Sequence, residues 1–201
     1  MGFAKTLYNW TGFVPDNANS LNDAKLSLQC CEENGVEDFL VTVWSDSGRD
    51  GSIFSVLPSL YAYSEIYYHR ATSIADVDKA KFKKTVGIGF DEFMLVDKLN
   101  KPYDDREYKS VNNKTFLYLY NDPFIGLLDS FVSDGIHERF KVITARLKKI
   151  KGREYQYIFD TLIALSDVLE IKSELGKRIR VSYENKDKKE LKKIQFLMTY
   201  G

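Results

Sequence analysis

Two strand-like segments lie within the first 44 residues of this 201-residue chain, with a helical segment between them. The first, residues 5–13, is rich in β-forming residues and leads into a Pro-Asp-Asn loop signature. The second, Phe39 to Trp44, is an unbroken apolar run typical of a strand buried on both faces. The segment between them has helical spacing, with Ser20 or Asn19 as the expected N-cap. This order predicts a βαβ unit with parallel strands and a right-handed crossover.

Helical patterns follow the second strand and continue to the end of the chain. Ser52 is the expected cap of the next helix, and Pro58 predicts a kink in it or a late start. Residues 116–120 fit either a strand or a helix. Further helices are expected over about 73–86, 91–99, 123–131, 135–150, 154–183 and 186–200.

A sheet of only two parallel strands would have two bare edges and little core. We therefore predict an α/β fragment followed by a mainly α part. Residues 1–71 are expected to be the end of a parallel α/β domain, and residues 72–201 an all-helical domain.

Composition excludes several classes of partner. The 29 acidic and 29 basic residues balance, so we expect no nucleic-acid partner, and no membrane partner because no apolar run approaches the roughly 20 residues of a span.

Cys30 and Cys31 are adjacent on the first predicted helix and point in different directions. We expect them to be unpaired in a reducing, cytoplasmic compartment. His69 and His137 have no cysteine or second histidine nearby in sequence, so no metal and no cofactor is expected.

The second strand ends in an aromatic residue and an acid, Trp44 and Asp46. In parallel α/β sheets the carboxyl edge of the strands is where ligands bind. An indole can cover the apolar face of a pyranose ring, and a carboxylate can accept hydrogen bonds from its hydroxyls. These two residues therefore indicate a sugar site.

Several motifs, in order, resemble the last two βα units of glycoside hydrolase family 20 barrels, the exo-β-N-acetylhexosaminidases. The similar segments are Trp10-Thr-Gly-Phe-Val-Pro-Asp-Asn17, Cys31-Glu-Glu-Asn-Gly35, Val41-Thr-Val-Trp-Ser-Asp46 and Phe54-Ser-Val-Leu-Pro-Ser-Leu60. The likeness covers residues 3–70 and continues more loosely through Glu174-Leu-Gly-Lys-Arg-Ile-Arg180. It implies two terminal units of a (β/α)8 barrel followed by the helical C-terminal domain of one branch of the family.

The resemblance also implies a chemistry. In this family the substrate's own acetamido oxygen attacks the anomeric carbon, an acid protonates the leaving oxygen, and an Asp orients the acetamido group. That Asp-Glu pair belongs to the fourth strand of the barrel and has no counterpart in this chain. We therefore expect no catalytic residue here, an intact parent that acts on an amino-sugar oligosaccharide, and a chain that is inactive by itself.

Four residues are carried over as candidate substrate-binding residues. Trp44 matches the tryptophan that walls the terminal sugar site, and Asp46 matches an acid that binds distal hydroxyls, where many members have Glu. Tyr8 matches a tyrosine that supports the acetamido group, although Asn9 and Trp10 replace the usual acid two residues on. Trp10 is a candidate second sugar-facing aromatic.

Structural alternatives stand beside each of these roles. Trp44 could plug the top of a barrel core, Asp46 could cap the following loop, and Tyr8 and Trp10 could pack against neighbouring elements. The helical part could pack against the barrel or form a homodimer surface. The competing functional hypothesis is a non-catalytic helical interaction domain whose leading βαβα segment has lost catalysis.

Overall fold

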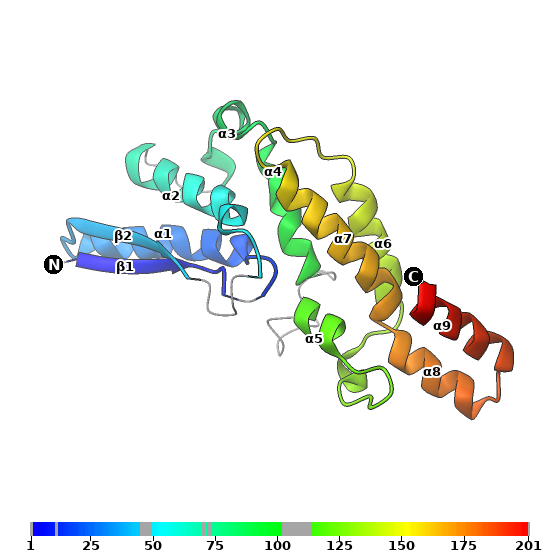
Figure 1. Cartoon of the computed structure of the whole chain (residues 1–201). Coiled ribbons are helices and arrows are strands. Elements are labelled where there is room, and N and C mark those ends of the chain that lie inside the picture. The colour runs from blue at the N-terminus through cyan, green and yellow to red at the C-terminus, as the bar shows by residue number, and fades with distance from the viewer. Residues whose placement is uncertain are drawn as a thin grey trace.

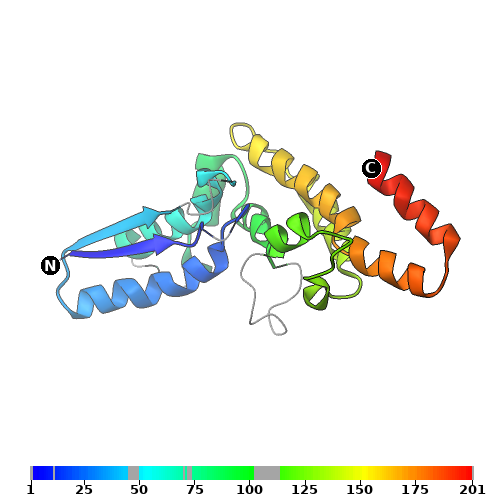
Figure 2. The same cartoon turned by 60° about the horizontal axis from the view of Figure 1, so that its bottom comes forward.

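The computed structural model describes residues 2–10, 12–44, 50–69, 71, 74–101 and 114–200. Figure 1 shows an elongated molecule with a small βαβα segment at the N-terminal end and helices over the rest. The N-terminus lies at one end of the long axis and the last two helices lie at the other, as the second view confirms (Figure 2). No described helix is long and apolar enough to cross a membrane.

The first three elements form the predicted βαβ unit. Strand β1 (Gly2–Leu7) pairs in parallel with β2 (Asp38–Val43), and α1 (Asn17–Glu33) connects them. The first strand is shorter than the sequence predicts, because the chain leaves the sheet after Leu7. Tyr8 N donates to the Ser20 hydroxyl at 2.9 Å, and Tyr8 O accepts from Asp16 N at 2.8 Å. Local bonds to the start of α1 therefore replace the sheet ladder at Tyr8.

Asp16, and neither Ser20 nor Asn19, is the N-cap of α1. Its carboxylate accepts from Asn19 N at 3.0 Å, so the helix begins earlier than predicted. After β2, Ser52 caps a 3-10 turn, η1 (Ile53–Val56), and α2 (Leu57–His69) follows with Pro58 in its first turn. The late start expected from Pro58 is thus confirmed.

The prediction that β2 is buried on both faces is wrong for the described chain. Phe39, Val41 and Val43 pack with α1 and α2 in a small cluster centred on Leu7, Ala24, Leu28, Val56 and Tyr63. Leu40 points to the other face and is 61% exposed. Both helices pack on the face of the sheet that carries Phe39, Val41 and Val43, and no other described element covers the second face (Figure 2).

The remaining elements are helical. Residues 116–120, for which the sequence allowed either a strand or a helix, are part of a helix. The elements are η2 (Ile74–Asp76), α3 (Lys79–Val86), α4 (Phe90–Phe93), η3 (Met94–Leu99), α5 (Lys114–Tyr120), η4 (Asp129–Phe131), α6 (Ile136–Leu147), α7 (Gln156–Lys172), α8 (Leu175–Glu184) and α9 (Lys188–Tyr200). Helices α6 and α7 pack side by side along the helical part (Figure 1).

The single helix predicted over 154–183 is in fact two helices, α7 and α8. The break falls at Ser173 and Glu174. The Glu174 carboxylate turns back to the start of α6, where it accepts from Ile136 N at 3.0 Å and contacts His137 Nδ1 at 2.5 Å. It thereby caps the buried start of a helix that lies 38 residues earlier in the sequence.

The main hydrophobic core lies among α4, η3, α6 and α7 and contains aromatic rings with no exposed surface. The Phe93 ring lies 5.3 Å from Phe159 and 6.1 Å from Phe82, both edge to face. Val14 and Leu21 from the N-terminal segment belong to the same cluster. The core therefore continues across the predicted domain boundary at residue 71, and that boundary stays a prediction.

Candidate functional site

The carboxyl edge of the sheet brings two of the predicted site residues to neighbouring strand ends. Leu7 pairs with Val43 at the last position of the parallel ladder, so the two strands end level. Tyr8 and Trp44 are the next residue on each strand. Both residues therefore lie at the carboxyl edge of the sheet, which is where parallel α/β sheets bind ligands. Their role in substrate binding stays a prediction.

Tyr8 is held on the α1 side of this edge. Its hydroxyl donates to Asp23 Oδ2 at 3.0 Å, and Lys5 Nζ donates to the same oxygen at 2.8 Å. Burial, together with the bond to Asp23, raises the pKa of Tyr8. The bond from Lys5 lowers the pKa of Asp23 despite the opposing effect of burial. The Tyr8 hydroxyl is therefore already engaged in an intramolecular network.

Trp10 packs against Tyr8, with ring centroids 4.7 Å apart and the ring planes tilted by 33°. This contact brings two candidate residues together and supports the packing role that the sequence left open for both. Trp44 differs, because 56% of its surface is exposed. It does not plug a core in the described chain, and its indole is accessible at the strand end. Asp46 lies outside the described residues.

Directly beneath this edge is a buried polar network that sequence reasoning missed. Helix α1 starts at the carboxyl edge of the sheet, and Asp97 of η3 binds its first turn. Ala18 N donates to Asp97 Oδ2 at 2.8 Å, and Asn17 Nδ2 donates to Asp97 Oδ1 at 2.9 Å. The Ser59 hydroxyl completes the network by donating to Asn17 Oδ1 at 2.6 Å.

The electrostatics of this network are unusual. Only 5% of Asp97 is exposed, and burial raises the pKa of its carboxyl to about 7 in spite of the hydrogen bonds from Ala18 and Asn17. Two further contacts join the residues after η3 to the segment before α1. Lys101 pairs with Asp16 at 2.6 Å, and Asn100 Nδ2 donates to Val14 O at 3.3 Å. No local pattern marks Asp97, since it sits in an apolar run and its partners lie about 80 residues away.

A cavity of about 490 Å³ lies between residues 50–55 and α7. Phe13, Ile158 and Leu162 supply apolar walls, and the Ser52 hydroxyl lies 3.1 Å from the Tyr157 hydroxyl at its rim. Gly51 is required here, because a Cβ would lie 2.3 Å from Phe13 O. The close approach fixes the loop after the second strand against the segment after the first.

No group of three or more His, Cys, Asp or Glu side chains in the described ranges could hold a metal ion. Cys31 is buried, Cys30 is exposed, and both are free thiols. His69 and His137 each contact a carboxylate, Glu65 at 3.1 Å and Glu174 at 2.5 Å. These pairs join neighbouring turns or helices.

The fold therefore combines a short parallel βαβα segment with a helical domain that carries most of the core. The Glycoside Hydrolase 20C C-terminal domain family model matches residues 91–198, and the chain belongs to this family. The match covers α4 to α9 almost completely and includes Asp97 and Glu174. The family is a domain of glycoside hydrolases, which confirms the resemblance to glycoside hydrolase family 20. No curated protein matches the chain.

Proposed function

We propose that this chain contributes one wall of the sugar site in a glycoside hydrolase that removes terminal β-linked N-acetylhexosamine, or a closely related amino sugar. The family match supports a glycoside hydrolase parent. The single observation that carries the sugar-wall role is the exposed Trp44 ring at the carboxyl edge of two parallel strands that end level.

In this proposal Trp44 covers the apolar face of the sugar ring and Asp46 accepts hydrogen bonds from its hydroxyls. The bond that breaks is the glycosidic bond, and the attacking atom is the substrate's acetamido oxygen. The group that protonates the leaving oxygen is not assigned to this chain. Tyr8 is a weaker candidate than Trp44, because its hydroxyl would have to leave Asp23 before it could bind an acetamido group.

Ligand-observed NMR of the 201-residue chain with N-acetylglucosamine tests the sugar wall. We expect weak binding, because part of a site has few contacts to offset the entropy lost on association. Trp44→Ala should weaken it about tenfold or more. Tyr68→Ala is the matched control, since Tyr68 is an exposed aromatic on α2, away from the strand ends. Equal binding by Trp44→Ala, or no binding by the intact chain, would contradict the proposal.

The same preparation should not release chromophore from a chromogenic N-acetylglucosaminide, because the catalytic acid is not assigned to it. Release that persists after further purification and follows the protein peak would contradict this expectation. An active chain would place the acid among these residues.

A non-catalytic interaction role remains the second candidate, and the α8–α9 hairpin favours it. The hairpin lies at the C-terminal end of the molecule (Figure 2) and carries exposed apolar side chains, among them Val181, Tyr183 and Met198. We propose this surface as the homodimer contact. Light scattering over a concentration series would test it, and a monomer at all concentrations would exclude it.

A further inference from the structure

We propose that Asn17 and Asp97 are positioning residues for the sugar site. Asp97, a residue of the helical domain, fixes the Asn17 side chain, and Asn17 joins the chain segments that follow β1 and β2. These two residues, with Ala18, Ser55 and Ser59, form what we call the Asn17–Asp97 lock. Its role in sugar binding rests on the proposed function, whereas its contacts do not.

The chain segments that follow the two strands meet at the Asn17 side chain. The segment after β1 carries Trp10 and enters α1 at Asn17. The segment after β2 begins at Trp44 and enters η1 and then α2. Asn17 Nδ2 donates to Ser55 O of η1 at 3.0 Å, and the Ser59 hydroxyl of α2 donates to Asn17 Oδ1 at 2.6 Å. One amide therefore joins the ends of both segments.

Asp97 fixes the orientation of that amide from the helical domain. An asparagine side chain has two N–H donors and one carbonyl oxygen, and the second donor of Asn17 binds Asp97 Oδ1 at 2.9 Å. The other carboxylate oxygen accepts from Ala18 N at 2.8 Å. Turning the amide over would set Asn17 Oδ1 against two acceptors, Asp97 and Ser55 O. Asn17 has no exposed surface, so bulk water does not compete for these bonds.

A buried carboxylate is a costly way to stabilise a core, and an apolar side chain at position 97 would do so more simply. A fully bonded polar network instead fixes one arrangement of the parts that it joins. Both oxygens of Asp97 accept bonds from the first turn of α1. We therefore assign to Asp97 the placement of the segments that carry Trp10 and Trp44.

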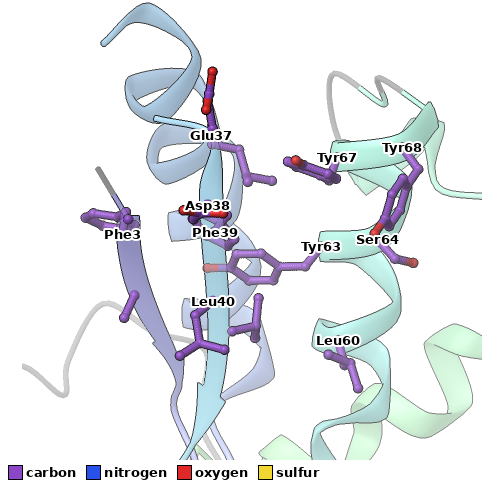
Figure 3. Close-up of a pocket in the computed structure, with 14 residues that line it drawn as sticks. Phe3, Glu37, Asp38, Phe39, Leu40, Leu60, Tyr63, Ser64, Tyr67 and Tyr68 are labelled. Atoms are coloured by element: carbon purple, nitrogen blue, oxygen red, sulfur yellow. The ribbon is translucent and has the colours of Figure 1, made fainter. Parts of the chain in front are cut away.

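The Asn17–Asp97 lock also acts on a helix that packs along the sheet. Ser59 and Tyr63 are one turn apart on α2, and the Tyr63 ring lies 6.0 Å from the Phe39 ring of β2 (Figure 3). The lock thus holds the start of α2, while the contact with Phe39 holds its body. Loss of the lock should therefore loosen the segment between β2 and α2 while the helix stays on the sheet.

Contacts nearer the surface join the same two segments without the Asn17–Asp97 lock. Gly51 packs against Phe13 O, and the Phe13 ring stacks on Phe116 of α5 with centroids 4.8 Å apart. The Ser52 hydroxyl lies 3.1 Å from the hydroxyl of Tyr157, which is 47% exposed. These contacts should keep the segments near each other, so we expect local loosening and not unfolding when the lock is removed.

Hydrogen exchange of the 201-residue chain tests the Asn17–Asp97 lock. Asp97→Ala leaves two buried N–H donors without an acceptor, so amides in the segments after β1 and β2 should exchange about tenfold faster or more. Amides in α7 should keep their rates. Glu174→Ala is the matched control, because Glu174 is also a buried carboxylate that accepts from a backbone N–H at a helix start. Unchanged rates or uniform acceleration in Asp97→Ala, or the same pattern in Glu174→Ala, would overturn the proposal.

Asn17→Ala completes a double-mutant cycle with Asp97→Ala. Because both residues act through one shared bond, the double variant should exchange less than about threefold faster than the faster single variant. Accelerations that simply multiply would mean that the two residues act independently, which would overturn the lock. Ser59→Ala removes a single bond and should speed exchange about threefold. It keeps the test decisive if circular dichroism shows that a larger truncation unfolds the chain.

Binding of N-acetylglucosamine separates the Asn17–Asp97 lock from the sugar site. Its affinity, measured by ligand-observed NMR, should fall about threefold or more in Asp97→Ala and stay unchanged in Glu174→Ala. Equal affinity together with faster exchange would overturn the positioning role. No binding by the intact chain would contradict the proposed function, and with it the sugar role of the lock, whereas the exchange pattern would still support or overturn the lock itself.

Discussion

The sheet and the helical domain of this protein are stabilised in different ways. In the helical domain Phe82, Phe93, Phe140 and Phe159 have no exposed surface and belong to one continuous cluster. In the sheet the described elements cover only one face, where a few side chains pack around Leu7. A two-stranded parallel sheet with one bare face buries too little apolar surface to be stable alone.

The sheet therefore depends on its attachment to the helical domain, and that attachment is concentrated at the start of α1. Leu21 reaches the main core, while Asp97 and Lys101 bind the first turn of α1 and its cap. The start of α1, and with it the carboxyl edge where Trp44 lies, is therefore held from the helical side.

Phe159→Ala should lower the free energy of unfolding by about 3–5 kcal/mol, because it removes a fully buried ring and leaves a cavity. If the sheet depends on the helical domain, chemical denaturation followed by far-UV circular dichroism and by the fluorescence of Trp10 and Trp44 should give one shared, shifted transition. Phe124→Ala is the control, since Phe124 is 69% exposed and should change stability by only about 0.5 kcal/mol or less. Two separate transitions in Phe159→Ala would show that the sheet folds independently.

Asp97 should make stability depend on pH. Its pKa is raised to about 7, against roughly 3.9 in an unfolded chain, so between these values the folded state binds a proton that the unfolded state does not. The contribution of Asp97 to stability should therefore be fully present below about pH 4 and be lost, by an amount on the order of a few kcal/mol, as the pH rises to 7. Urea denaturation at several pH values measures this slope.

Asp97→Asn removes the ionisable group and should flatten that slope. Asp91→Asn is the matched control, because Asp91 is an exposed carboxylate on the adjoining α4, paired with Lys79 at 2.7 Å. A slope that persists in Asp97→Asn would mean that another group is responsible. A slope lost in both variants would also rule out the assignment to the buried network at α1.

Local patterns in the sequence predicted most of the helices and the βαβ order, because apolar spacing reports directly on which face of an element is buried. Contacts between distant residues set the features that were missed. The helix predicted over 154–183 is interrupted because Glu174 caps the start of α6, 38 residues away. The first strand ends at Leu7 because Tyr8 bonds to Ser20 and Asp16, which no strand propensity reveals.

The candidate site was predictable to a similar degree. The apolar run that ends in Trp44 predicted a tryptophan at the carboxyl edge of the sheet. In the structure Trp44 lies at that edge and is exposed. The tilted contact of Trp10 with Tyr8 has no local signature. The bond from Tyr8 to Asp23 depends on where α1 lies. Residue type and strand position therefore identify a candidate, whereas the partners of its polar atoms require the fold.

Leu40 gives the smallest expected effect and the sharpest test of the bare face. Leu40 and Leu7 are leucines of the same sheet that point to opposite faces, one 61% exposed and the other with no exposed surface. Leu7→Ala should lower the free energy of unfolding by about 2–4 kcal/mol, whereas Leu40→Ala should change it by about 0.5 kcal/mol or less. Denaturation of both variants in parallel measures the difference. A comparable loss for Leu40→Ala would mean that this face is covered in solution, and the contrast between an open sheet and a closed helical core would then describe only the single chain.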